Sequence, residues 1–316
     1  MATTTSASTE ASNPFGQRPQ SRSYSLERLE RRTGFLFALP ALAGFAVFIV
    51  IPMVCVLLLS MYKVDLMTYT FEFKQFQYYD KMLHDADFWK SVRNTLVYML
   101  IYVPLTLALG LGMALILNSK MRARGIVRTF FIVPYITTYV ATLVVWNVFL
   151  HPTEGPVNAL LMGLGVEKPP QYMVDTHWAL PMLALIGAWK DVGYHCILFL
   201  AALQGVSRDY YEASAIDGAG RFQRFRQITL PLISPTSFYL LLITIIGGLQ
   251  AFYQMALLTK GGPAFSTTTL TYYIYRSAFE FYNFSYASAV GMFLFVLTLA
   301  LIAVNWLGQK KWVFYQ

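Results

Sequence analysis

Six long apolar runs divide this chain, and they constrain its fold more than any other feature. Each has about the 20 residues that an α-helix needs to cross roughly 30 Å of hydrocarbon. The runs cover residues 34–60, 94–117, 127–150, 179–203, 237–258 and 287–307. Because a bilayer offers no hydrogen-bond partners to the backbone, each run must be helical, and the prolines inside the runs are expected to be local kinks. The sequence therefore predicts an all-α, polytopic membrane protein with six transmembrane helices.

The composition supports a membrane protein. Hydrophobic residues make up 56% of the chain and charged residues 13%, whereas soluble domains contain about 25% charged residues. Residues 1–33 begin with a Ser/Thr/Ala-rich segment without apolar periodicity, which predicts a disordered tail, and end in a short basic helix expected at the membrane surface. Residues 34–316 are predicted to form one transmembrane domain.

Basic residues are unevenly distributed over the two sides that alternate between the runs. Fifteen lysines and arginines lie in the two terminal segments and in the connections after the second and fourth runs, against eight on the other side. The positive-inside rule therefore predicts that both termini are cytoplasmic. This asymmetry also accounts for most of the net charge of +8, so the charge does not indicate nucleic-acid binding.

Motifs typical of enzymes are absent from the sequence. It contains no H-E-x-x-H, no G-x-S-x-G and no phosphate loop G-x-x-x-x-G-K-S/T, and its four histidines are scattered. We therefore predict that the chain is not an enzyme and holds no metal or cofactor. If the protein takes part in ATP-driven work, another polypeptide must bind the nucleotide.

The polar connection at residues 207–230, between the fourth and fifth runs, is expected to carry the function. Ser207 can cap a helix over residues 208–216, and Gly218 permits a sharp bend before a second short helix that lasts until Pro231. Glu212 places one carboxylate beside small residues on the first helix, which suits an arginine on a partner. The pattern fits a docking knob for a soluble protein or an amphipathic connector lying on the lipid, and the residues alone do not decide between them.

Several motifs then resemble one family. The run Glu212-Ala-Ser-Ala-Ile-Asp-Gly-Ala219, with Leu230-Pro231 after it, resembles the EAA loop of binding-protein-dependent ABC importer permeases. Before it Trp189-Lys-Asp-Val-Gly-Tyr194, and after it Leu258-Thr-Lys-Gly-Gly-Pro263, are similar to the carbohydrate branch of that family, the maltose and glycerol-3-phosphate permease type. The resemblance extends from about residue 35 to the C-terminus.

The resemblance implies the type I ABC importer permease fold and a set of partners. The loop would dock into an ATP-binding ABC ATPase dimer, which would hold ATP and Mg²⁺. A second permease subunit would complete a heterodimeric channel, and an extracytoplasmic solute-binding protein would deliver a sugar across the bacterial inner membrane. The residues expected to couple the loop to the ATPase are Arg208, Glu212, Ala213, Asp217, Gly218, Ala219 and Phe225.

The substrate path is predicted from polar and aromatic residues at bilayer depth. A charged residue there costs roughly 2.5 to 3.5 kcal/mol, so Lys190 and Asp191 should face protein or water. At a spacing of four residues, Asp191 can meet His195 and Lys190 can meet Tyr194, either to lock helices together or to bind sugar hydroxyls. The resemblance to the carbohydrate branch also implies substrate contacts within residues 189–194 and at Thr244 and Gly248. The full set of candidates is Trp146, Trp189, Lys190, Asp191, Tyr194, Thr244, Gly248, Gln250, Tyr253 and Gln254.

A further stripe on the third run is ambiguous. Tyr135, Thr138, Thr142 and Trp146 share one helical face, which fits either a sugar pocket or ordinary helix packing. Other functions also stay open. Within the importer class, glycerol phosphate or a polyol is the alternative substrate; in other classes, an ion-driven secondary transporter or a membrane scaffold would not need the docking loop.

Overall fold

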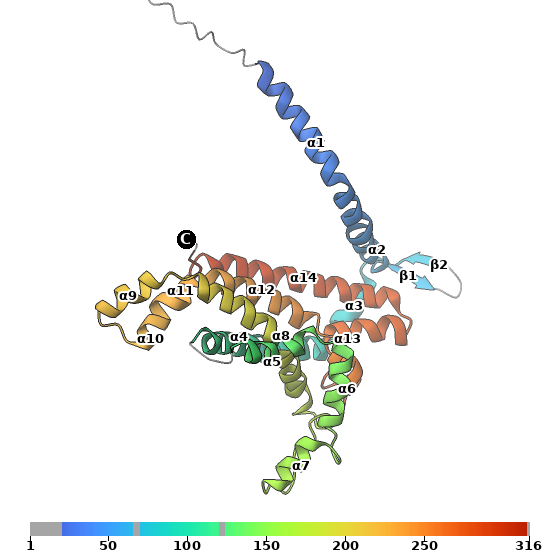
Figure 1. Ribbon diagram of the computed structural model, residues 1–316. Coiled ribbons are helices and arrows are strands. Elements are labelled where there is room, and N and C mark those ends of the chain that lie inside the picture. Colours follow the sequence, from blue (N-terminus) through green and yellow to red (C-terminus); the bar gives the residue numbers. More distant parts are fainter. Residues whose placement is uncertain (1–20, 66–69, 120–123, 315–316) are drawn as a thin grey trace, which may run out of the picture. The chain divides into compact units, whose positions relative to one another are not determined.

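The computed structural model describes residues 21–65, 70–119 and 124–314, so most of the tail predicted to be disordered lies outside the described residues. The chain divides into two units, Met1–Cys55 and Val56–Gln316. The first unit holds α1 (Ser21–Phe45), a π-helical segment (Ala46–Val50) and the start of α2 (Ile51–Leu59) (Figure 1). The basic helix predicted before residue 34 is not separate, because no helix-breaking residue precedes the apolar run and α1 continues into it.

The described residues of the second unit are mostly helical, and their two strands form an antiparallel hairpin in which Tyr62 pairs with Phe73. Its elements in chain order are β1 (Tyr62–Asp65), β2 (Thr70–Phe73), α3 (Gln77–Leu83), α4 (Ala86–Asn118), α5 (Arg124–Ile136), α6 (Tyr139–Phe149), α7 (Pro156–Gly163), α8 (Ala179–Gly205), α9 (Arg208–Ile216), α10 (Arg221–Arg224), α11 (Leu230–Leu232), α12 (Ser234–Leu249), α13 (Leu270–Tyr275) and α14 (Phe284–Gln309). Three π-helical segments cover Phe225–Thr229, Met255–Thr259 and Arg276–Glu280.

The structure is compatible with six spans, but two of them are bent. Among the described residues, four helices are long and apolar enough to cross a membrane: Thr33–Leu59, α4, α8 and α14. Two bent pairs complete the set, α5 with α6 at 100° and Arg221–Leu232 with α12 at 68°. The third predicted run is therefore broken in the middle, where a local proline kink was expected.

The fifth predicted run was too long at its C-terminal end. α12 ends at Leu249 rather than at residue 258. The last carbonyl groups of a helix lack partners within the helix. Here two threonines at the start of α13 donate hydrogen bonds to the last residue of α12 and to the chain just beyond it. Thr271 donates its hydroxyl to the Leu249 oxygen at 2.9 Å, and Thr269 donates to the Ala251 oxygen at 3.0 Å. These contacts stop the helix early, and no pattern within the run itself encodes them.

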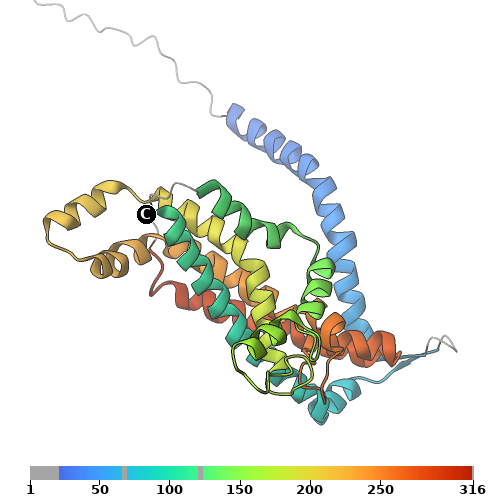
Figure 2. The same ribbon diagram turned by 60° about the horizontal axis from the view of Figure 1, so that its bottom comes forward.

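α4 and α8 pack against each other at the centre of the second unit. Their backbones approach closely at Gly110, where an added Cβ would lie 2.6 Å from the Cβ of His195. α12 packs on α4, with α14 beside it, and α5 packs on α8 (Figures 1 and 2). The buried cluster at the centre joins Tyr98 and Tyr102 of α4 to Leu183 of α8 and Leu249 of α12.

The helices of the second unit begin and finish at two opposite ends. At one end, called the α9 end, α4, α8 and α14 finish and α12 begins, and the backbone N–H of Phe314 donates to the Ser234 hydroxyl at 2.9 Å. At the opposite end, called the α3 end, α4, α8 and α14 begin. There Asp85 caps α4 and accepts hydrogen bonds from the hydroxyls of Tyr273 at 2.6 Å and Tyr286 at 2.5 Å.

Candidate functional site

The first helix of the predicted docking loop forms as expected. α9 begins at Arg208 and ends at Ile216, and Ser207 is its N-cap. The Ser207 hydroxyl accepts from the backbone N–H of Asp209 at 3.3 Å. Asp209 also places a negative charge in the first turn, where the helix dipole favours it. The prediction of the helix and of its cap is confirmed.

The bend after α9 depends on Gly218. Its φ is +78°, in the left-handed region that glycine adopts without steric cost. The backbone N–H of Ala219 returns to the Ser214 oxygen at 2.9 Å and closes the turn. A second helical arm then runs from Arg221 to Leu232, one residue beyond the predicted end at Pro231.

A side-chain contact ties the two arms together. The Tyr211 hydroxyl on α9 lies 3.0 Å from the Thr229 hydroxyl on the second arm. The arms also separate clearly from the bundle and fold back on themselves at the α9 end (Figures 1 and 2). Residues 207–230 therefore form a compact bent projection, called the α9–α10 knob.

The predicted coupling residues lie on the surface of this knob. Arg208, Glu212, Ala213, Asp217 and Gly218 are exposed, and Ala219 and Phe225 are half-buried. None of the three ion pairs among the described residues includes Glu212. The tip also presents apolar side chains, with Ile216 88% and Phe222 75% exposed. The knob thus offers a carboxylate beside unpaired apolar side chains.

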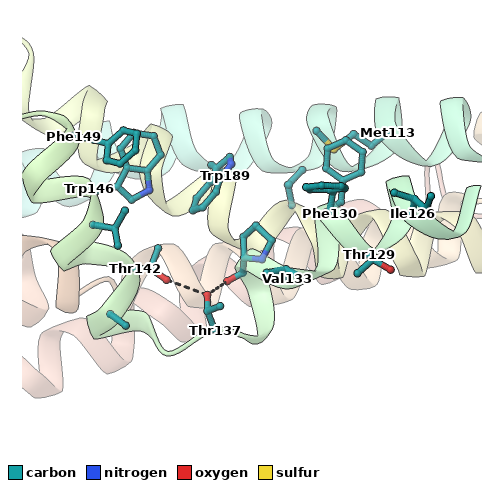
Figure 3. A pocket seen from close by; sticks show the side chains of 15 residues that line it. Met113, Ile126, Thr129, Phe130, Val133, Thr137, Thr142, Trp146, Phe149 and Trp189 are labelled. Carbon is teal, nitrogen blue, oxygen red and sulfur yellow. Dashed lines mark hydrogen bonds between the residues drawn. The ribbon is translucent and has the colours of Figure 1, made fainter. Parts of the chain in front are cut away.

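A large cavity lies between α4, α5, α6 and α8 of the second unit. Its volume is about 1110 Å³. Trp146 of α6 and Trp189 of α8 line one end, with ring centroids 5.4 Å apart and planes nearly perpendicular. Figure 3 shows these indoles beside Phe149, while Met113, Phe130 and Ile126 lie farther along the cavity. Apart from the two indoles, its polar side chains are Thr129, Thr137 and Thr142.

Only Trp146 and Trp189 of the ten predicted path residues line this cavity. Four of the others lie near the end of α12, in two different environments. Gly248 and Gln254 are buried against α4: an added Cβ at Gly248 would lie 3.1 Å from Met99, and the Gln254 amide donates to the Tyr98 hydroxyl at 2.6 Å. Gln250 and Tyr253 are exposed after the end of α12.

The neighbouring charges Lys190 and Asp191 point to different partners. Lys190 is buried and donates from Nζ to the backbone oxygens of Pro134 and Thr137, each at 2.8 Å. The Asp191 carboxylate accepts from the Tyr102 hydroxyl at 2.6 Å. Adjacent helical residues project about 100° apart, so the two side chains diverge. No ion pair joins them among the described residues.

The two side-chain pairs predicted at a spacing of four residues do not form. His195 contacts the backbone oxygen of Asp191 through Nδ1 at 2.9 Å, and its Nε2 lies 2.7 Å from the Thr244 hydroxyl. The ring nitrogens therefore use the backbone and α12, and the Asp191 carboxylate turns to α4. Tyr194 is not a partner of Lys190, because its ring stacks on another tyrosine.

That stacking partner belongs to a group of three tyrosines from three helices. The Tyr194 ring lies 5.2 Å from the ring of Tyr135 on α5, nearly parallel to it. The Tyr194 hydroxyl lies 3.3 Å from the hydroxyl of Tyr239 on α12. Tyr135 and Tyr239 are exposed and Tyr194 is half-buried. This group, called the tyrosine cluster, presents phenolic hydroxyls, whereas no tyrosine is among the described residues that line the cavity.

The predicted stripe on the third run does not exist as one face. The chain breaks at Thr137 and Thr138 between α5 and α6, so a continuous helical spacing no longer applies. Tyr135 joins the tyrosine cluster, whereas Thr142 and Trp146 line the cavity. The stripe was predicted from an unbroken helix, and that assumption was wrong.

Two buried tyrosines of α4 were not predicted from the sequence. Tyr98 and Tyr102 lie one turn apart, stack at 5.4 Å and bind Gln254 and Asp191, respectively. Polar groups at this spacing inside an apolar run are a signal for partners across a helix interface.

Within the described ranges, no three histidine, cysteine or acidic side chains gather as ligands for a metal.

Comparison with known proteins places these features in context. Residues 106–313 match the family described as binding-protein-dependent transport system inner membrane component. The chain is 34% identical to the lactose transport system permease protein LacF of Rhizobium radiobacter, over 88% of this chain and 94% of that protein. It is 31% identical to the trehalose/maltose transport system permease protein MalF of Thermococcus litoralis, over 88% and 94%.

A solved structure is similar over nearly the whole chain. The crystal structure of a bacterial alginate ABC transporter, in complex with an alginate pentasaccharide-bound periplasmic protein, contains a chain that superimposes with a TM-score of 0.78 at 25% identity. The match covers 90% of this chain and 96% of that chain.

Proposed function

The chain belongs to the family of binding-protein-dependent transport system inner membrane components, and on that premise we propose that it is the permease subunit of an ATP-driven importer for a sugar or oligosaccharide. As an inner-membrane component it is a multi-pass protein of that membrane. The names of its relatives support a carbohydrate substrate, since they include lactose and trehalose/maltose permeases. The observation that carries the coupling mechanism is the α9–α10 knob.

The surface of the knob is suited to contact a separate ATPase and to be moved by it. Its exposed carboxylate at Glu212 and its apolar tip at Ile216 and Phe222 fit a cleft with a basic group and an apolar floor. The partner ATPase dimer would hold ATP and Mg²⁺. With positive-inside orientation, the knob and both termini face the cytoplasm, where such a dimer resides.

Movement of the knob would pass directly to a spanning helix. The second arm ends at Leu232, and α12 begins at Ser234 after the fully buried Ile233. A short, buried joint of this kind lets the arm and α12 move as linked rigid bodies. α12 contacts α4 and α8, so its displacement would change the packing around the central tyrosines. Closure of the ATPase dimer would thus switch the direction in which the path opens.

The path itself is assigned to the aromatic and hydroxyl groups on α5, α6 and α8. Trp146 and Trp189 supply flat surfaces for the CH faces of a sugar ring, and the tyrosine cluster supplies hydroxyls for its rim. Because this surface is open in a single chain, a second permease subunit is proposed to complete the channel. A solute-binding protein would deliver the ligand at the α3 end, in parallel with the periplasmic protein of the alginate complex.

A sugar is favoured over glycerol phosphate as the substrate, because the buried Lys190 charge is bound within the protein. A phosphate would require cationic side chains facing the path, but the Lys190 ammonium is already bound by two backbone oxygens. An ion-driven secondary transporter is less well supported, because it would have no need of the α9–α10 knob.

Reconstitution tests the proposed function. The chain would be purified with its proposed partner membrane and ATPase subunits, placed in proteoliposomes and supplied with the solute-binding protein and a panel of labelled sugars. ATP-dependent uptake is expected, with none when the ATPase is omitted. Uptake that depends on an ion gradient and not on ATP would instead support the secondary transporter.

A further inference from the structure

The break between α5 and α6 lies within a membrane-spanning segment. α5 ends at Ile136, α6 begins at Tyr139, and the two helices are bent by 100°. The last carbonyl groups of a helix have no partners within the helix, and hydrocarbon supplies no water to replace them. A break at this depth therefore needs hydrogen-bond donors from elsewhere in the protein.

Lys190 of α8 supplies two of the hydrogen bonds at this break, beside one from the Thr137 hydroxyl to the Pro134 oxygen. Its Nζ donates to the Pro134 oxygen and to the Thr137 oxygen, each at 2.8 Å. The same ammonium lies 5.0 Å from the ring centroid of Tyr139, the first residue of α6. The residue is only 3% exposed. One cation therefore contacts the end of α5 and the start of α6 at once.

The contact also satisfies the lysine. A buried ammonium is costly unless its donors are bound, and a positive charge is favoured at the C-terminal end of a helix. Two of its three N–H donors reach carbonyl oxygens, and an aromatic face lies beside it. The nearby Asp191 carboxylate is bound by Tyr102 instead. The broken helix and the buried cation thus satisfy each other.

The two arms held by Lys190 form the wall of the cavity. α5 contributes Phe130 and Val133, and α6 contributes Trp146 and Phe149. Three residues after Lys190, on the same face of α8, Gly193 lets α5 approach closely, because an added Cβ would collide with the backbone oxygen of Phe131. Both contacts fix α5 on α8, but only Lys190 also reaches α6.

We propose that Lys190 is a positioning residue for transport. Its ammonium fixes the bend between α5 and α6, and with it the shape of the cavity and the place of Trp146 against Trp189. It does not touch the sugar. The activity part of this inference rests on the proposed transport function, whereas the bend can be measured without transport.

Lys190→Met tests the role of the ammonium with little change in side-chain length. It leaves the Pro134 and Thr137 oxygens without a cationic donor, so the bent form is expected to lose population at least about tenfold against straighter forms. Lys190→Arg keeps the charge and the donors and should retain the bend. Lys310→Met, at an exposed lysine at the end of α14, is the matched control for loss of one positive charge.

The bend is measured by the distance between spin labels on the two arms. Labels at Arg128 on α5 and Val148 on α6, both exposed and both outside the cavity lining, would be attached after Cys55→Ser and Cys196→Ala remove the natural thiols. Pulsed electron resonance would be recorded on the assembled transporter in lipid nanodiscs. In Lys190→Met the distance should lengthen and broaden, while Lys190→Arg and Lys310→Met should keep the parental distribution.

Uptake separates positioning from substrate contact. In Lys190→Met the maximal uptake rate should fall about tenfold or more for every sugar carried, together with the longer distance. A parental distance with only a raised KM would overturn the proposal and make Lys190 a substrate contact; a parental distance with normal uptake would overturn it as well. If Lys190→Met does not assemble, Lys190→Gln keeps a neutral donor but removes the charge next to the Pro134 and Thr137 oxygens and should broaden the distribution; an unchanged distribution would count against the proposal. If the parental complex transports no sugar, the proposed function fails while the distances still test the bend.

Discussion

At the scale of single residues, Lys190 and Asp191 are adjacent in the sequence, but their side chains point in different directions and bind different partners. The sequence places two charges side by side at bilayer depth, which predicts that both face protein or water. It does not give their partners, because adjacent positions on α8 face different neighbours. Lys190 reaches the end of α5, and Asp191 reaches Tyr102 on α4. Those partners are distant in the chain, so only the tertiary fold selects them.

Asp191→Asn is expected to impair uptake while the protein still assembles. The amide keeps the size of the carboxylate and can still accept from the Tyr102 hydroxyl, so only the charge is lost. A charge-assisted hydrogen bond contributes about 1.5 to 3 kcal/mol, which corresponds to a loss of roughly tenfold or more if the charge acts in transport. Initial uptake rates and basal ATPase activity would be measured in proteoliposomes. Unchanged values of both would assign Asp191 a purely structural role.

Glu212→Lys is expected to uncouple ATP hydrolysis from uptake. The exposed carboxylate on α9 is proposed to face a basic group of the ATPase, so a lysine would create a like-charge contact costing several kcal/mol. Sugar uptake should fall at least about tenfold, with normal insertion into the membrane. Glu154→Lys, at an exposed acid before α7, is the matched charge reversal and should leave coupling intact. Wild-type uptake by Glu212→Lys would remove this residue from the interface.

Asp85 predicts a pH dependence of stability at the α3 end. Burial raises the pKa of its carboxyl, but hydrogen bonds from Tyr273, Tyr286 and the start of α4 outweigh this effect and hold the pKa below its ordinary value. A lowered folded-state pKa stabilises the protein above the unfolded pKa of about 3.9 and loses that contribution as the pH falls through the folded pKa.

Asp85→Asn keeps a helix cap but removes this charge. The melting temperature in detergent should therefore fall at pH 7, by an amount that corresponds to about 1 to 2 kcal/mol. The difference between the two proteins should shrink progressively below about pH 4. If the melting temperatures of the two proteins differed by the same amount at pH 7 and below about pH 4, the carboxylate charge would not stabilise this end of the bundle.

At the scale of elements, two glycines of the knob differ in backbone conformation, so valine substitutions at the two positions test whether the bend is needed. Gly218 has a φ of +78°, whereas Gly220 has a φ of −68° and a ψ of 168°, and nothing lies within 4 Å of an added Cβ at either position. Gly218→Val should destabilise the bend by at least about 1 to 2 kcal/mol, because a branched side chain disfavours the left-handed region.

Gly220→Val is the matched control, because valine readily adopts an extended conformation. Co-purification of the ATPase should decrease for Gly218→Val and stay normal for Gly220→Val. Equal association of both variants would show that the bend is not needed for docking.

The elements most accurately predicted were those governed by local signals. Ser207 and Gly218 define α9 and its bend through capping and φ preference, which neighbouring residues do not override. The boundaries that were wrong depend on remote donors. Thr271 stops α12 at Leu249, and Lys190 stabilises the break that ends α5 at Ile136. Apolar periodicity cannot reveal a helix end that a distant side chain satisfies.

At the scale of the whole molecule, the chain has features of one half of a path. The cavity and the tyrosine cluster present aromatic and hydroxyl groups on surfaces that this chain leaves open, and the knob presents an uncovered apolar tip. Composition and run lengths were enough to predict the membrane class and the all-α fold. The identity of the sugar follows from neither, because the path is completed by another subunit in the proposed assembly.

The central claim is that the α9–α10 knob docks onto a separate ATPase. A photo-cross-linking residue at Ala213, exposed on the knob, tests this directly in native membranes, with Ala159, exposed on α7 at the other end of the second unit, as the control. We expect Ala213 to form an adduct with the nucleotide-binding subunit and Ala159 to form none with it. Adducts from Ala213 to lipid alone would contradict the claim.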